Sequence, residues 1–121
     1  PSEIDYVNAH GTSTPENDKM EFLSLSAVFG EKLARLPVSS SKSMIGHTLS
    51  AAGAIEAVIS LLTMQHSVIP PTINRDESDP EIAMDVVPDH SRSARVRNVL
   101  SNSFGFGGQN VCLVVGRYDG V

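Results

Sequence analysis

The sequence predicts an α/β fold in which strands and helices alternate in the order β-α-β-α-β-β. Short runs of strand-forming residues occur at residues 4–8 and 37–41, and a segment of helical character follows each run. Residues 49–64 form a long apolar stretch of helical length. Two further strand-like runs, at residues 96–103 and 111–116, flank a glycine-rich turn and predict a C-terminal hairpin.

Length and composition restrict the class of protein. The chain has 121 residues, which corresponds to one domain or part of one, and its net charge of −5 excludes the basic footprint of a nucleic-acid-binding domain. The single cysteine, Cys112, excludes an internal disulfide, and its position within an apolar strand predicts a small buried side chain. We find neither a signal peptide nor a membrane span, and we expect a cytoplasmic protein.

The first predicted helix has start and stop signals. Thr14 is a favourable N-cap, Pro15 fits the first helical position, and Gly30 ends the helix. Helical spacing predicts one inward-facing apolar side. It comprises Met20, Leu23, Ala27 and Val28, broadened by Phe22, Leu25 and Phe29.

The second predicted helix, about Gly46 to His66, is the most apolar segment of the chain. Apolar side chains surround almost the whole helix, so we expect a central helix that is buried on most sides. Glu56 lies inside it, and a buried carboxylate is costly unless it is paired. The sequence therefore predicts a buried contact between Lys42 and Glu56, with Asp18 as a second candidate carboxylate beside Lys42.

The region after the second helix is polar. Residues 72–94 contain prolines and acidic residues, and they predict a surface loop with a short edge strand at residues 84–87. The basic cluster of Arg92, Arg95 and Arg97 is interpreted as a solvated surface.

Candidate chemistry gathers where the predicted strands end. His10 follows the first strand, Lys42 and His47 follow the second, and Phe106 lies in the turn after the third. If these strands run parallel, their carboxyl ends meet at one edge of the sheet. The expected helix start at His47 favours a neutral imidazole, which can donate one hydrogen bond. Two such donors that converge on one oxygen make an oxyanion hole.

Structural alternatives exist for each of these residues. A turn histidine can bond a backbone carbonyl, Lys42 can be a surface lysine, and Phe106 can be a core residue. The glycine-rich turn at residues 105–108 precedes a strand instead of a helix, which argues against a phosphate-binding loop. The histidines have no metal-ligand spacing, so we expect no metal site.

Taken together, four segments resemble the C-terminal part of a β-ketoacyl-acyl-carrier-protein synthase of the elongating type, in the thiolase-like superfamily. They are residues 6–15 (YVNAHGTSTP) followed by Asp18, residues 42–47 (KSMIGH) with residues 51–54 (AAGA), residues 70–74 (PPTIN) and residues 102–108 (NSFGFGG). The resemblance implies that residues 1–121 are a partial C-terminal ketosynthase region. Its fold would be an incomplete half of a thiolase-like layered fold, with a mixed sheet, a buried central helix and a C-terminal hairpin.

The resemblance implies decarboxylative Claisen condensation of a malonyl carrier protein with an acyl-enzyme thioester, in fatty-acid or polyketide biosynthesis. The family's cysteine nucleophile belongs to an N-terminal half that this sequence does not contain, so we expect an acyltransferase region that is inactive alone. The implied partners are an acyl carrier protein, which carries the substrates on phosphopantetheine, and the missing N-terminal half. A full-length member would form a homodimer, and the chain itself would bind no cofactor.

The resemblance also implies roles for individual residues. His10 and His47 would stabilise the enolate that forms on decarboxylation. Lys42 would organise the site together with Glu56 and Asp18.

Substrate contact and gating are implied for other residues. Thr12 and Thr14 would bond the phosphopantetheine arm. The backbone N–H of Phe106 would join the acyl oxyanion hole, and its ring would gate the pocket. Gln109 stands where the family commonly has Thr, and we expect little effect from this difference.

Two other interpretations stay open. A non-catalytic module derived from the same fold would bind an acyl carrier protein or a partner chain. The joint presence of His10, Lys42 and His47 argues against such a module, whose histidines would be free to change. An unrelated small α/β domain would carry the motifs by coincidence and would place His10 far from His47.

Overall fold

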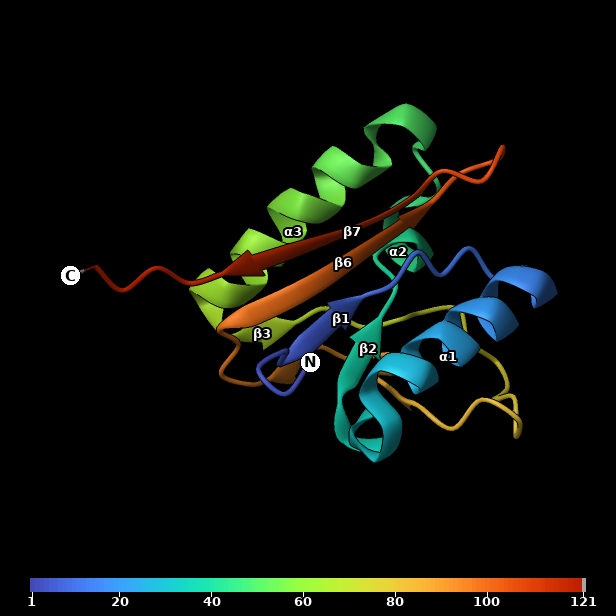
Figure 1. The fold of residues 1–121 in the computed structure, drawn as a ribbon, viewed down its shortest axis with the longest axis horizontal. Coiled ribbons are helices and arrows are strands. Elements are labelled where there is room, and N and C mark those ends of the chain that lie inside the picture. The colour runs from blue at the N-terminus through green and yellow to red at the C-terminus, as the bar shows by residue number, and fades with distance from the viewer. Residues whose placement is uncertain (121) are drawn as a thin grey trace.

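The computed structural model describes residues 1–120. A mixed five-stranded sheet in the order β4-β2-β1-β6-β7 forms its centre, with helix α1 on one side and helix α3 on the other (Figure 1). The elements of this unit are β1 (Tyr6–Asn8), α1 (Pro15–Phe29), β2 (Pro37–Ser39), α2 (Lys42–Ile45), α3 (Ala52–His66), β4 (Asp85–Val86), β6 (Asn98–Phe104) and β7 (Asn110–Gly116). Two 3-10 turns, η1 (Gly30–Arg35) and η2 (Leu49–Ala51), and a small antiparallel sheet of β3 (Val68–Ile69) and β5 (Arg92–Ser93) complete it.

The three strands that lead into the candidate residues run parallel, which is the condition for their carboxyl ends to meet at one edge. β1 lies between β2 and β6 and pairs in parallel with both, and β2 pairs in parallel with the edge strand β4. β6 and β7 form the predicted antiparallel hairpin. The carboxyl ends of β1, β2 and β6 therefore meet at one edge of the sheet.

Neighbouring residues on the strands point to opposite faces of the sheet and build two separate cores. On one face Val7 packs with Leu25 and Phe29 of α1. On the other face Tyr6 and Val99 pack with Met64 of α3. The alternation follows from the two-residue period of a β-strand.

The ends of α1 agree with the prediction, but its orientation does not. Thr14 Oγ1 accepts a hydrogen bond from Asn17 N at 3.2 Å, and Gly30 ends the helix at a φ of 53°. Of the predicted apolar face, Leu25 and Phe29 are buried, as expected, but Met20, Leu23, Ala27 and Val28 face solvent, and Glu21 is buried beside Leu25 and Phe29. Backbone donors near His10 bind the Glu21 carboxylate, and this contact turns the 21-25-29 side of the helix inward.

The predicted central helix begins later than expected, and its burial differs from the prediction. α3 starts at Ala52, because Leu49 adopts a φ of 54° and interrupts the helical backbone between Gly46 and the first turn of α3. Among the described residues, the buried stripe of α3 is mostly polar. It consists of Ala52, Glu56, Ser60, Thr63 and Met64. Val58, Leu61 and Leu62 are exposed, so the expectation of burial on most sides is wrong for residues 1–120.

The edge strands complete the comparison with the prediction. β4 lies inside the predicted edge strand at residues 84–87. Cys112 is exposed, which contradicts the expected burial, because β7 is the other edge of the sheet and the described residues leave most of it uncovered. Within residues 1–120, no helix has the length and apolar character needed to cross a bilayer.

The N-cap of α1 yields a stability prediction. Replacing Thr14 with Ala removes the acceptor for Asn17 N and should lower the free energy of unfolding by about 1 kcal/mol. Thr14→Asp, the control, retains an acceptor at the helix N-terminus and should stay near the wild-type value. Urea unfolding measures both, and equal stability of Thr14→Ala and the wild type would contradict the capping role.

Candidate active site

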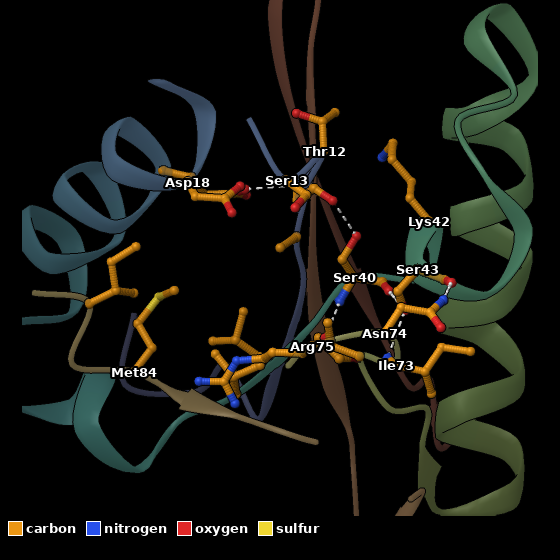
Figure 2. Close-up of a pocket in the computed structure, with 18 of the residues that line it drawn as sticks. Thr12, Ser13, Asp18, Ser40, Lys42, Ser43, Ile73, Asn74, Arg75 and Met84 are labelled. Atoms are coloured by element: carbon orange, nitrogen blue, oxygen red, sulfur yellow. Dashed lines mark hydrogen bonds between the residues drawn. The ribbon is translucent and has the colours of Figure 1, made fainter. Parts of the chain in front are cut away.

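Four of the predicted site residues, which are Thr12, Asp18, Lys42 and His47, line one pocket at the carboxyl edge of the sheet (Figure 2). His10 lies between two other lining residues, Ala9 and Gly11. The pocket has a volume of about 890 Å³ and opens to solvent. The turn after β1, the start of α1, the α2 turn and the loop that follows Thr72 form its walls. Its lining includes Thr12, Asp18, Ser40, Lys42, His47 and Asn74.

His10 and His47 lie side by side although they are far apart in sequence. Their ring centroids are 5.5 Å apart, and the ring planes cross at 85°. Phe104, at the end of β6, also lies beside His10, and the centroids of these two rings are 5.4 Å apart. The coincidental-motif alternative, which requires the two histidines to be distant, is therefore contradicted.

A backbone donor sets the proton position on His47. The N–H of Leu49 donates to His47 Nδ1 at 3.2 Å, so Nδ1 acts as an acceptor and the proton of a neutral ring is on Nε2. The sequence predicted another influence on the His47 ring, which was the dipole of a helix that starts at His47. Helix α3 starts only at Ala52, and the contact present at His47 is the hydrogen bond from the Leu49 amide.

His10 is buried, and its surroundings oppose a positive charge. The residue is 7% exposed, and Nδ1 has no hydrogen-bond partner among the described residues. Burial lowers the pKa of His10 below its ordinary value of 6.5, and the positive charge of Lys42 lowers it further, while Glu21 partly opposes both effects. His10 is therefore a neutral imidazole at neutral pH.

The predicted contact between Lys42 and Glu56 is present. Lys42 Nζ donates to Glu56 Oε1, and both side chains are almost completely buried. Burial raises the pKa of Glu56, and the bond from Lys42 opposes that rise. The ion pair joins the α2 turn, which carries Lys42, to the buried stripe of α3.

Glu21 is the functional residue that the sequence analysis missed. It is 3% exposed, and its carboxylate accepts hydrogen bonds from His10 N at 2.9 Å, Gly11 N at 2.9 Å and Asn102 Nδ2 at 3.0 Å. It therefore fixes the backbone of the His10 turn and joins that turn to β6. The signal was an acidic residue at the same helical spacing as Leu25 and Phe29, on the side that proved to be buried.

Of the remaining predicted residues, Asp18 and Thr12 line the pocket and Thr14 does not. Asp18 lines the pocket opposite Lys42 and accepts a hydrogen bond from Asn17 Nδ2 at 3.0 Å, so the expected proximity of Asp18 to Lys42 is wrong. Thr12 lines the pocket and is half-buried, whereas Thr14 is exposed and caps α1.

Phe106 is fully exposed at the tip of the β6–β7 hairpin. Its ring belongs to neither of the two cores that residues 1–120 form, so the alternative that Phe106 is a core residue is wrong for this part of the chain. Phe104, two residues earlier, is the aromatic residue that contacts His10. Within the part of the chain that the structure describes, three or more His, Cys, Asp or Glu side chains suited to a metal ion do not cluster.

A family model and several known proteins place the chain in one class. A family model described as "Beta-ketoacyl synthase, C-terminal domain" matches residues 1–76. The chain is 49% identical over 117 residues to 3-oxoacyl-(acyl-carrier-protein) synthase 2 of Coxiella burnetii, and the match covers 97% of the chain and 28% of that relative.

Solved structures agree with this similarity. A β-ketoacyl synthase from Burkholderia phymatum STM815 is 41% identical with a TM-score of 0.90, and the match covers 97% of the chain and 28% of that protein. A second solved structure is described as a type II PKS acyl-carrier protein in complex with its ketosynthase bound to the hexaketide. One chain of that complex is 37% identical to the chain with a TM-score of 0.94, and the match covers 98% of the chain and 29% of the matched protein. The chain thus spans less than a third of the length of these relatives.

The environment of His10 yields a titration prediction. We expect the ring to titrate below 6.5, because burial and the positive charge of Lys42 both disfavour the imidazolium. The Lys42→Met variant should raise this pKa, and Glu21→Gln should lower it further. An NMR titration of the His10 ring proton, assigned with a His10→Gln variant, measures the shift. A midpoint at or above the ordinary value would contradict the described environment.

The buried ion pair yields a double-mutant prediction. Lys42→Met alone leaves Glu56 without its buried partner and should cost about 3–5 kcal/mol of unfolding free energy near neutral pH. Because the pKa of the unpaired Glu56 is raised, the loss should shrink as the pH falls and the carboxyl becomes protonated.

Urea unfolding of Lys42→Met, Glu56→Leu and the double variant tests this coupling. The double variant should lose much less than the sum of the two single variants, because it buries no unpaired charge. Additive losses would show that the two side chains do not interact.

Proposed function

Because the chain belongs to the family of β-ketoacyl synthase C-terminal domains, we propose that it supplies the two-histidine part of a decarboxylating reaction centre. The reaction would be the condensation of a malonyl thioester with an acyl thioester in fatty-acid or polyketide synthesis, catalysed by an acyltransferase. The observation that carries the proposal is the pair of adjacent imidazoles, His10 and His47, beside an open pocket.

The proposed chemistry uses the imidazoles as hydrogen-bond donors. The bond between the carboxylate carbon and the methylene carbon of the malonyl group breaks, CO2 leaves, and the electron pair moves into the thioester carbonyl to form an enolate. The Nε2–H of His47 and the neutral ring of His10 would donate to the enolate oxygen. A neutral imidazole already carries one N–H, so neither ring needs an additional proton to act as a donor.

Lys42 would act on the site through charge and position. Its ammonium is fixed by Glu56 and lowers the pKa of His10, which favours the neutral donor over an imidazolium. An imidazolium would bind the negatively charged malonyl carboxylate and so stabilise the substrate before the reaction. Stabilising this ground state raises the barrier to loss of CO2.

Thr12 and Thr14 would contact the phosphopantetheine arm of an acyl carrier protein. The arm contains amide groups that accept and donate hydrogen bonds, and both hydroxyls lie on the turn that leads from His10 to α1. Thr14 Oγ1 accepts from Asn17 N in its capping role, and its O–H remains able to donate to a ligand. The similarity to a solved ketosynthase with its acyl-carrier protein supports this choice of partner.

The nucleophile would come from a second part of the enzyme. Cys112 lies in the middle of the exposed strand β7 and has no adjacent base, so it does not suit that role. The exposed apolar side chains of α3 and β7, which include Val58, Leu61 and Leu113, would pack against the cysteine-bearing half. The backbone N–H and the exposed ring of Phe106 would then face that half, and the complete enzyme would form a homodimer.

A second candidate function uses the same surface without catalysis. The chain would bind an acyl carrier protein or a partner chain through its pocket and its exposed apolar side. The exposed apolar side of α3 fits a binding module as well as it fits a part of a catalytic enzyme. The adjacent rings of His10 and His47, beside a paired Lys42, favour catalysis, because binding alone does not require this arrangement.

Release of CO2 from a malonyl carrier protein tests the proposal. The chain assembled with a cysteine-bearing ketosynthase half should release CO2, and the chain alone should not. His10→Ala and His47→Ala in the assembled enzyme should each lower the rate by roughly 10²- to 10³-fold, because each removes one donor to the enolate oxygen.

The exposed histidine His66 provides a matched control. His66 lies at the end of α3, outside the pocket, so the variant His66→Ala should leave the rate unchanged. Rates that stay within a few-fold of wild type in both His10→Ala and His47→Ala would overturn the proposal. Saturable carrier-protein binding by an assembly that never releases CO2 would favour the binding module instead.

A further inference from the structure

The segment of residues 70–74 (PPTIN) is specific in sequence, yet the proposed chemistry gives it no role. In the structure it crosses beside the α2 turn, whose first residue is Lys42 (Figure 2). α2 has four residues, and so short a helix has little stability of its own. Contacts with neighbouring segments therefore hold Lys42 in place, and the ion pair with Glu56 is one of them.

Three hydrogen bonds join this segment to the residues around Lys42. Ser40 N donates to Thr72 Oγ1 at 3.0 Å, Ile73 N donates to Ser43 Oγ at 3.0 Å, and Asn74 Nδ2 donates to Ser43 O at 3.0 Å. Figure 2 shows Ser40, Ser43, Ile73 and Asn74 close together below Lys42. Ser40 and Ser43 flank Lys42 in sequence, so the bonds hold the turn on both sides of it.

The segment is itself anchored to the sheet. Thr72 N donates to Val87 O at 2.7 Å, and Asp89 N donates to Thr72 O at 3.2 Å. Val87 N in turn donates to Val38 O of β2 at 2.9 Å. Asn74 adopts a φ of 58°, a conformation that asparagine tolerates better than most residues. The side chain that binds Ser43 is thus presented from a backbone with little freedom.

The same contacts reach the turn that carries His10. Ser40 Oγ donates to Gly11 O at 2.7 Å, and Ser43 Oγ donates to Ser40 O at 2.8 Å. A side chain at Gly11 would collide with Ser40, because an added Cβ would lie 2.5 Å from Ser40 Cβ. Ser40 therefore links the His10 turn, the α2 turn and Thr72 in one close-packed network.

We infer that residues 72–74 are a positioning clamp, in which Thr72 and Asn74 hold Ser40 and Ser43 so that Lys42 keeps its place beside the two histidines. This inference rests on the proposed function, because Lys42 matters there through its effect on His10 and the malonyl group. The clamp residues line the same pocket, but the proposed chemistry assigns none of them to the reacting atoms. They act through the backbone of the α2 turn.

Two substitutions break the clamp without straining the backbone. Ser43→Ala removes the oxygen that Ile73 N binds, and Asn74→Gly removes the donor to Ser43 O while keeping the positive φ accessible. Ser78→Ala is the matched control, since Ser78 lies in the same loop and its hydroxyl binds only Arg75 among the described residues. Ser43→Thr retains the hydroxyl and serves as the conservative rescue.

The first measurement is partial-reaction kinetics in the assembled ketosynthase. Ser43→Ala and Asn74→Gly should each lower kcat for CO2 release by roughly 10- to 100-fold, as expected for a misplaced group, with little change in KM. Acylation of the enzyme cysteine should stay near the wild-type rate, as should both activities of Ser78→Ala and Ser43→Thr. CO2 release near the wild-type rate, or equal loss of acylation and CO2 release, would overturn the inference.

The second measurement does not depend on activity. Amide hydrogen exchange at Met44, Ile45 and Gly46, whose N–H groups bond within the α2 turn, should accelerate in Ser43→Ala and Asn74→Gly but not in Ser78→Ala. Unchanged exchange would overturn the clamp. If the wild-type assembly releases no CO2, the proposed function fails, and the exchange measurement still decides whether residues 72–74 hold the turn.

Discussion

The parallel pairing of β1 with both β2 and β6 is the constraint on which the site depends. Because the three strands share a direction, the turns that follow them meet at one edge although they are separated by tens of residues. Phe104 is the last residue of β6, His10 lies two residues after the end of β1, and Lys42 lies three residues after the end of β2. Reversal of a single strand would place its turn at the opposite edge, and the contact between the histidine rings would be lost.

A layer of buried polar groups lies between the sheet and α3 and fixes how they meet. Tyr6 shares a hydrogen bond of 2.8 Å with Ser39, and Asn8 accepts from Ser41 Oγ at 3.1 Å and donates to Glu56 O at 3.3 Å. Burial raises the pKa of Tyr6 well above its ordinary range, so its hydroxyl keeps its proton. Directional bonds of this kind specify one packing arrangement more strictly than apolar contacts do, because a shifted helix would leave several polar groups unpaired.

Much of this architecture could be predicted from local chemistry. Thr14 and Gly30 mark the ends of α1 through their own side-chain and backbone properties, and the cost of burying Glu56 was enough to predict its partner. The rotation of α1 could not be predicted, because it depends on Glu21 binding backbone groups of a distant turn. The late start of α3 depends on the unusual backbone of Leu49, which residue type does not indicate. Helical spacing thus located the helices but did not determine which of their sides is buried.

Strand β7 has a consequence for the isolated chain. It lies at the edge of the sheet, and residues 110–116 (NVCLVVG) contain neither charge nor proline. An uncovered strand of this composition offers its free backbone groups to an identical strand of another molecule, and stacking of this kind leads to cross-β fibrils. The hairpin that completes the sheet is therefore also the segment through which separate molecules would polymerise, unless another surface covers it first.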